Sequence, residues 1–179
     1  MSQPGVLGVF TGGASRRMGR PKALLTHRGQ TLVERAVALG REVGLEVVLV
    51  GRRPELSHLP WPALADDPPG VGPIGGLRAL VRHASGRPAI ALACDMPFVD
   101  AADLRALLSA EGAVAAPRRA GRWEPLCARY APEALAVLDA QLAAGEHALW
   151  ALLEAAGATE VALPADHLSD WDAPEDIDA

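Results

Sequence analysis

The sequence has little cysteine and almost no lysine. It holds two cysteines, Cys94 and Cys127, and one lysine, Lys22, among 179 residues. Two cysteines this far apart exclude a disulfide framework and a CxxC metal site. No apolar run reaches the ~18 residues of a membrane span, and the first ten residues lack the basic and apolar stretches of a secretory signal. These absences predict a cytoplasmic protein without a membrane segment.

Positive charge is also scarce. Seventeen Lys and Arg residues against 22 Asp and Glu residues give a net charge of −5. This balance argues against a dominantly basic nucleic-acid-binding protein, so we expect no nucleic-acid partner. Because every other basic residue is arginine, Lys22 is a candidate for a role that arginine cannot fill, with chance as the alternative. Half of the residues are apolar, which suffices for one globular domain over residues 1–179.

Apolar runs alternate with helical periodicity along the chain. Continuous apolar runs at 6–10, 46–50 and 89–93 predict buried strands. A period near 3.6 over 31–43, opened by a capping box of Thr31 and Glu34, predicts a helix between the first two strands. Further helices are expected near 74–84, 103–109, 132–144 and 148–156, and further strands or extended segments at 63–65, 113–116, 123–130 and 160–163. This order predicts an α/β fold with a mostly parallel sheet.

A glycine-rich, basic segment follows the first predicted strand directly. Residues 11–22 read TGGASRRMGRPK. Glycines expose backbone N–H groups to an anion, and the four basic side chains add charge, so the segment suits a triphosphate. Its spacing matches neither the P-loop pattern nor the GxGxxG fingerprint. A solvated arginine-rich turn is the alternative.

Acidic residues supply the second candidate group. Asp95 follows the strand at 89–93, at the sheet edge where parallel sheets bind ligands, and one carboxylate with phosphate oxygens suits Mg²⁺. An N-cap role is the alternative for Asp95. The segment 66–76 (DDPPGVGPIGG) could form a nucleobase pocket, a lid or an ordinary surface loop. Asp170 and Asp172 could be ligand groups or part of an acidic tail.

Five motifs in order carry a resemblance over nearly the whole chain. VFTGGASRRMGRPKALL, GPIGGL, CDMPFV, EPLCARY and WDAPEDI resemble the molybdenum cofactor guanylyltransferases, the MobA-like nucleotidyltransferases. The resemblance implies a single-domain, Rossmann-like three-layer nucleotidyltransferase fold. It also implies Mg²⁺-dependent transfer of GMP from GTP to the phosphate of the molybdopterin cofactor, with release of pyrophosphate.

The resemblance also implies roles for individual residues. The Mg²⁺ ligand would be Asp95, and Gly51 falls near a base-contacting Asn of some family members, from which it departs. The catalytic residues implied are Arg17, Lys22 and Asp95. The residues implied in nucleotide binding are Phe10, Thr11, Gly12, Gly13, Lys22, Gly51, Asp67 and Asp95.

Two other functions stay open at this point. Asp170 and Asp172 stand where guanylyl enzymes often carry Asn, which favours a cytidylyltransferase using CTP, whereas the glycine motifs favour GTP. A non-catalytic nucleotide-binding adaptor for cofactor delivery is a third possibility. A molybdoenzyme or a cofactor-handover protein would be the protein partner. The arginines at 118, 119 and 122 are expected in a solvated loop, with contact to the acceptor phosphate as the alternative.

Overall fold

The computed structural model describes residues 4–12 and 21–171 and shows a central seven-stranded sheet, ordered β11-β7-β10-β6-β1-β4-β5. The pairs β1–β4, β1–β6, β4–β5 and β7–β11 are parallel, and β10 is antiparallel to both of its neighbours. The predicted mostly parallel α/β sheet is therefore confirmed. The strands are β1 (Val6–Phe10), β4 (Glu46–Val50), β5 (Ala63–Leu64), β6 (Ala89–Ala93), β7 (Val114–Ala116), β10 (Cys127–Tyr130) and β11 (Thr159–Glu160).

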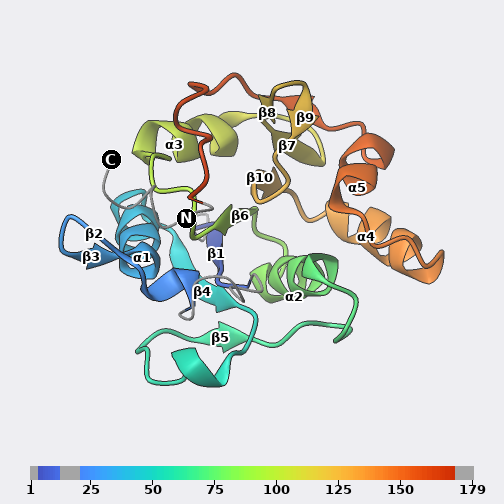
Figure 1. Cartoon of the computed structure of the whole chain (residues 1–179). Helices are drawn as coiled ribbons and strands as arrows, with labels where there is room; N and C mark the ends of the chain where they lie inside the picture. The colour runs from blue at the N-terminus through green and yellow to red at the C-terminus, as the bar shows by residue number, and fades with distance from the viewer. Residues whose placement is uncertain (1–3, 13–20, 172–179) are drawn as a thin grey trace.

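Helices cover both faces of this sheet (Figure 1). One face carries α1 (Leu32–Glu42) and α3 (Ala101–Ser109), and the other carries α2 (Pro73–Ala84), α4 (Ala134–Ala143) and α5 (Leu149–Ala155). Two hydrophobic cores result, one on each side of the sheet, as expected of a three-layer architecture. None of the helices in the described part of the chain has both the length and the apolar character to cross a membrane.

Strand β1 lies at the centre of the sheet and is buried on both faces, which explains its continuous apolar run. Gly8 interrupts that run for a packing reason. A Cβ atom at Gly8 would lie 2.5 Å from Cδ2 of Leu80 on α2 and 2.9 Å from Cγ2 of Val50. The absence of a side chain therefore lets α2 pack closely onto the middle of the sheet.

The starts of α1 and α3 are fixed by capping boxes. At α1 the Thr31 hydroxyl accepts from the Glu34 backbone N–H at 3.2 Å, and the Glu34 carboxylate accepts from the Thr31 N–H at 2.8 Å. This confirms the predicted cap. Asp100 and Asp103 form the same reciprocal pair at α3. The helix therefore begins two residues before the predicted start, because Asp100 satisfies the first free N–H groups.

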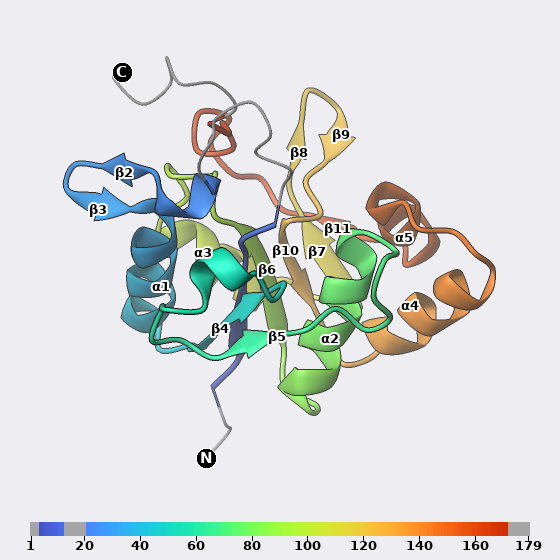
Figure 2. The same ribbon diagram turned by 60° about the horizontal axis from the view of Figure 1, so that its bottom comes forward.

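Two short hairpins were not predicted as such. They are β2–β3 (Thr26–His27, Gln30–Thr31) and β8–β9 (Arg118–Arg119, Arg122–Trp123). In Figure 2 the chain enters β1 from below, and the two hairpins stand on either side of the opposite edge of the sheet. The expected solvated loop at 118–122 is thus an ordered hairpin. Within residues 4–12 and 21–171 there are also two short 3₁₀ helices, η1 (Lys22–Leu24) and η2 (Pro54–Leu56).

Candidate active site

The carboxyl ends of β1 and β6 bring the two main sequence candidates together. Phe10 pairs with Ala93 at the end of these parallel strands, and the backbone N–H of Cys94 donates to the Phe10 carbonyl at 3.1 Å. Asp95 follows directly. Lys22, which opens η1, places its Nζ 3.2 Å from Oδ2 of Asp95. The two side chains are 19% and 24% exposed, so the ion pair is shielded but remains accessible to a ligand.

The residues directly after β1 offer their backbone to a ligand. The Thr11 hydroxyl donates to the Val50 carbonyl at 3.3 Å and is buried. The Phe10 ring is part of the core on the α2 side. Their side chains are therefore committed to the fold, and any nucleotide contact at these two positions would involve the main chain. Gly12 is exposed. Gly13 and Arg17 lie outside the described residues.

Gly51 directly follows β4 and has a backbone φ of +91°, a conformation that favours glycine. Its N–H donates to the Leu64 carbonyl at 3.0 Å, and it lines a pocket of about 490 Å³ with residues of the β4–β5 connection. The side chain with which some family members contact the base, that of an Asn, is therefore absent at Gly51. A base contact at Gly51 would therefore come from its main chain.

Asp67 faces helix α2. Its Oδ2 accepts from Arg78 at 2.7 Å and from Arg82 at 3.3 Å. The neighbouring Asp66 lies near the Phe10 ring, since a Cβ atom at Gly76 would lie 3.2 Å from Asp66 Oδ1 and 3.3 Å from Phe10 Cε1. Sequence reasoning missed Asp66, because nothing in the pair of adjacent aspartates tells which side chain turns towards the strand ends.

The segment before residue 172 lies over the same edge. The Trp171 N–H donates to the Asp95 carbonyl at 2.9 Å, and the Trp171 ring meets His27 edge-on at a centroid distance of 4.7 Å. Asp170 accepts from Arg119 Nη1 at 2.6 Å. Asp170 thus lines a pocket together with Asp95, and its role as a ligand group stays a prediction. Asp172 lies outside the described residues.

Arg119 connects this segment to the β8–β9 hairpin. Its Nε donates to Glu124 at 2.8 Å, so two carboxylates share one guanidinium. The hydrogen bond that Arg119 donates to Asp170 is the main cause that raises the pKa of Arg119, and burial raises the pKa of Glu124. Asp95, Arg119, Glu124 and Asp170 line a pocket of about 250 Å³. No sequence motif indicated that Glu124 would face this pocket.

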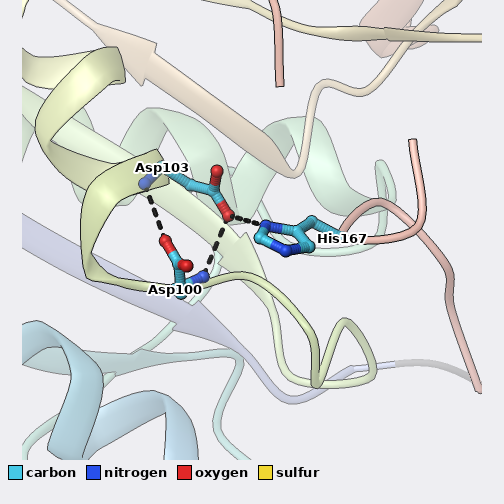
Figure 3. A group of neighbouring side chains, drawn as sticks. All are labelled: Asp100, Asp103 and His167. Carbon is cyan, nitrogen blue, oxygen red and sulfur yellow. Dashed lines mark hydrogen bonds and ion pairs between the residues drawn. The ribbon is translucent and has the colours of Figure 1, made fainter. Parts of the chain in front are cut away.

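A second polar cluster holds the chain segment that precedes Asp170. His167 Nδ1 lies 2.8 Å from Asp103 Oδ2, and both carboxylates of the α3 capping box belong to the group (Figure 3). Possible ligand atoms of Asp100, Asp103 and His167 lie within 4.8 Å of one another. Hydrogen bonds within the group account for this geometry. The cluster ties the chain before Asp170 to the start of α3.

The environment of both cysteines argues against a nucleophilic role. Burial raises the pKa of Cys94 to about 12 and that of Cys127 likewise to about 12. Both thiols stay protonated at neutral pH and are buried. Cys94 is buried in the turn directly after β6, and Cys127 is buried in β10.

Comparison with known proteins agrees with this arrangement. The family model described as "MobA-like NTP transferase domain" matches residues 8–161. The chain belongs to the MobA-like NTP transferase family. A probable molybdenum cofactor guanylyltransferase of Opitutus terrae is 39% identical over 95% of this chain and 91% of the relative. One of Mycobacterium tuberculosis is 36% identical over 87% of this chain and 82% of the relative.

A solved structure supports the fold of this MobA-like transferase. The molybdopterin-guanine dinucleotide biosynthesis protein A of Archaeoglobus fulgidus has a TM-score of 0.77 at 26% sequence identity, covering 97% of this chain and 95% of that one. The resemblance to the family and the predicted fold class are therefore confirmed. The individual roles of the site residues in this MobA-like transferase stay predictions.

Proposed function

We propose that this protein is a molybdenum cofactor guanylyltransferase, which transfers GMP from GTP to the phosphate of the molybdopterin cofactor and releases pyrophosphate. The observation that carries the proposal is the Lys22–Asp95 pair of 3.2 Å at the carboxyl ends of β1 and β6. It combines a cation for a triphosphate with a carboxylate for a metal in a family of nucleotidyltransferases. Relatives that cover most of the chain carry the same guanylyltransferase name.

The donor nucleotide would lie over the end of β1. Gly12 is exposed there and has no side chain, and Lys22 pairs with Asp95 at the same edge of the sheet. An ammonium group there would stabilise the charge that develops on the leaving pyrophosphate. Arg17 and Gly13 are predicted to take part from the segment between residues 12 and 21.

Asp95 fits the requirements of Mg²⁺, a hard cation that takes oxygen ligands and retains phosphate oxygens in its shell. Within the described ranges, the carboxylate of Asp95 has a single hydrogen-bonding partner, Lys22 at Oδ2. We expect its Oδ1, which has no partner among residues 4–12 and 21–171, to be the atom that a cation would bind. When bound, Mg²⁺ would supply charge neutralisation at the phosphates.

The acceptor would occupy the pocket of about 250 Å³ on the other side of Asp95. An oxygen of its phosphate would form the bond to the α-phosphorus of GTP, and the bond from that phosphorus to the bridging oxygen would break. Because a phosphate is already ionised, this transfer requires no general base. The chain's contribution is to position both substrates and to balance their charge. Arg119, held between Glu124 and Asp170, lines this pocket as a fixed cation.

Pyrophosphate release tests the proposal directly. The purified protein would be incubated with GTP, CTP, ATP or UTP, with Mg²⁺ and freshly prepared molybdenum cofactor. Release that needs GTP, the cofactor and Mg²⁺ together is expected. Preference for CTP would refute the guanylyl assignment and favour the cytidylyl alternative. Asp170 would then be the residue to replace by Asn, because guanylyl enzymes often carry Asn at this position. Nucleotide binding without pyrophosphate release would favour the adaptor alternative.

A protein partner follows from the chemistry of the proposed product. A dinucleotide cofactor must reach an apoenzyme, so we expect contact with a molybdoenzyme or a cofactor-handover protein. Location in the cytoplasm remains a prediction of the sequence.

A further inference from the structure

Arg53 lies against Gly12, two residues after the end of β1, although nothing in the sequence pattern indicated it. It precedes η2 in the connection after β4. A Cβ atom at Gly12 would lie 3.0 Å from Arg53 Nη2, 3.6 Å from Nε and 3.8 Å from Cζ. Three atoms of the guanidinium thus lie at the Gly12 backbone. A side chain at residue 12 would meet the guanidinium.

The guanidinium of Arg53 makes no hydrogen bond or ion pair with any residue of the described ranges, yet it is half-buried. Two other arginines near the sheet do have acidic partners. Arg78 binds two carboxylates, and so does Arg119. A half-buried cation without a counter-charge is unfavourable. An anionic ligand at this position would remove that cost.

Arg53 lies at the edge of the sheet where the donor phosphates are expected, because its guanidinium adjoins Gly12, two residues after the end of β1. Arg53 also lines the pocket of about 490 Å³ beside Gly51. The arginine therefore stands between an open pocket and the loop after β1.

We propose that Arg53 is a binding residue for the phosphate chain of the donor nucleotide, acting beside Lys22. The proposal rests on the proposed nucleotidyltransferase function. A guanidinium offers a planar fork of N–H donors that matches two phosphate oxygens, and it stays charged at every relevant pH. Lys22 supplies a compact charge next to Asp95, whereas Arg53 supplies directional donors over Gly12.

Arg52 provides a matched control. It is the neighbouring residue with the same side chain, but it is exposed, and its Nε donates to the Ala63 carbonyl at 3.3 Å. Arg52→Ala and Arg53→Ala remove the same charge from the protein. A general electrostatic effect would therefore weaken nucleotide binding equally in both variants, whereas a direct contact would affect only one.

The experiment is a calorimetric titration of both variants and the unchanged protein with GTP, GDP, GMP and guanosine, with Mg²⁺ and without acceptor. For Arg53→Ala we expect GTP affinity to fall about 10- to 100-fold, the usual loss for a hydrogen bond to a charged group. The affinity for guanosine should stay unchanged, and Arg52→Ala should stay within about threefold for GTP. Arg53→Lys should recover only part of the loss.

Three results would overturn the proposal: unchanged GTP affinity in Arg53→Ala, an equal loss for GTP and guanosine, or an equal loss in Arg52→Ala. Equal loss for guanosine would place the contact at the base. Thermal unfolding of each variant, with Arg53→Gln as a second replacement, separates binding from folding. If the unchanged protein prefers cytidine nucleotides, the same series is run with them. Pyrophosphate release by Arg53→Ala at normal GTP affinity would refute the Arg53 contact alone, whereas no nucleotide binding by the unchanged protein would refute the proposed function as well.

Discussion

Replacing Asp95 by Asn tests the centre of the proposed site. The exchange keeps the size of the side chain and removes the negative charge 3.2 Å from the Lys22 ammonium. An amide oxygen is a weaker ligand for Mg²⁺ than a carboxylate. We expect the variant to fold, to need much more Mg²⁺ and to lose nearly all turnover.

Two effects of Asp95→Asn can be sized, the loss of kcat and the loss of folding stability. Loss of one preorganised charge contact at the reacting phosphates lowers kcat by about 10²- to 10³-fold. The side chains of the ion pair are 19% and 24% exposed. Its loss should therefore cost more than the ~0–1 kcal/mol of an exposed pair and less than the ~3–5 kcal/mol of breaking a buried one. We therefore expect a stability loss of about 1–2 kcal/mol. In a domain of this size that lowers Tm by about 2–8 °C.

The assay measures pyrophosphate release across a range of Mg²⁺ concentrations, with thermal unfolding of the same samples. Asp139→Asn is the control, because it also removes a carboxylate from an ion pair, the one with Arg78 at 2.6 Å, but on the exposed surface of α4. This control should keep its kcat and its Mg²⁺ dependence. A kcat near normal in Asp95→Asn, with unchanged Mg²⁺ dependence, would refute the assignment of Asp95 as metal ligand.

Three further predictions concern the fold around the site. The hydrogen bond with Asp103 is the main cause that raises the pKa of His167. The stabilisation that this pair gives the folded protein is therefore complete below about pH 6.5 and is lost as the pH rises through the pKa of His167 in the folded state. The Tm difference between the unchanged protein and His167→Gln should shrink from pH 6 to pH 9, and a constant difference would contradict this. Thr31→Ala removes the cap that Glu34 completes and should cost about 1 kcal/mol in urea unfolding; no loss would mean that the cap is dispensable. Burial raises the pKa of Cys94 to about 12, so a thiol reagent at pH 8 should label it only at the rate of unfolding.

Most of the central sheet could be predicted because buried parallel strands are continuous apolar runs. The three strands at 6–10, 46–50 and 89–93 were predicted with the bounds that the structure shows. The two hairpins were not, since two-residue strands have no measurable periodicity. The antiparallel direction of β10 was also outside the prediction, because local sequence does not encode the direction in which a strand joins a sheet.

The candidate site could be predicted only in part. Lys22 and Asp95 were named from their motifs, and the structure places them in contact. Arg53 and Asp66 were missed because each has a neighbour of the same type, and sequence does not show which of two adjacent side chains turns towards the strand ends. Glu124 was quoted in a motif but had no predicted role, because its burial depends on the hairpin beside it.

The sequence by itself determined the order of the main strands and helices, the family and the two residues at the centre of the site. These properties are carried by local patterns, namely apolar periodicity, helix caps and short motifs. Only the tertiary structure decided which distant groups meet. Lys22 reaches Asp95 across 73 positions of the chain, and Arg119 reaches Asp170 across 51. The physical reason is that parallel strands end at a common edge, while the paths of the loops above that edge decide which side chains come within bonding distance.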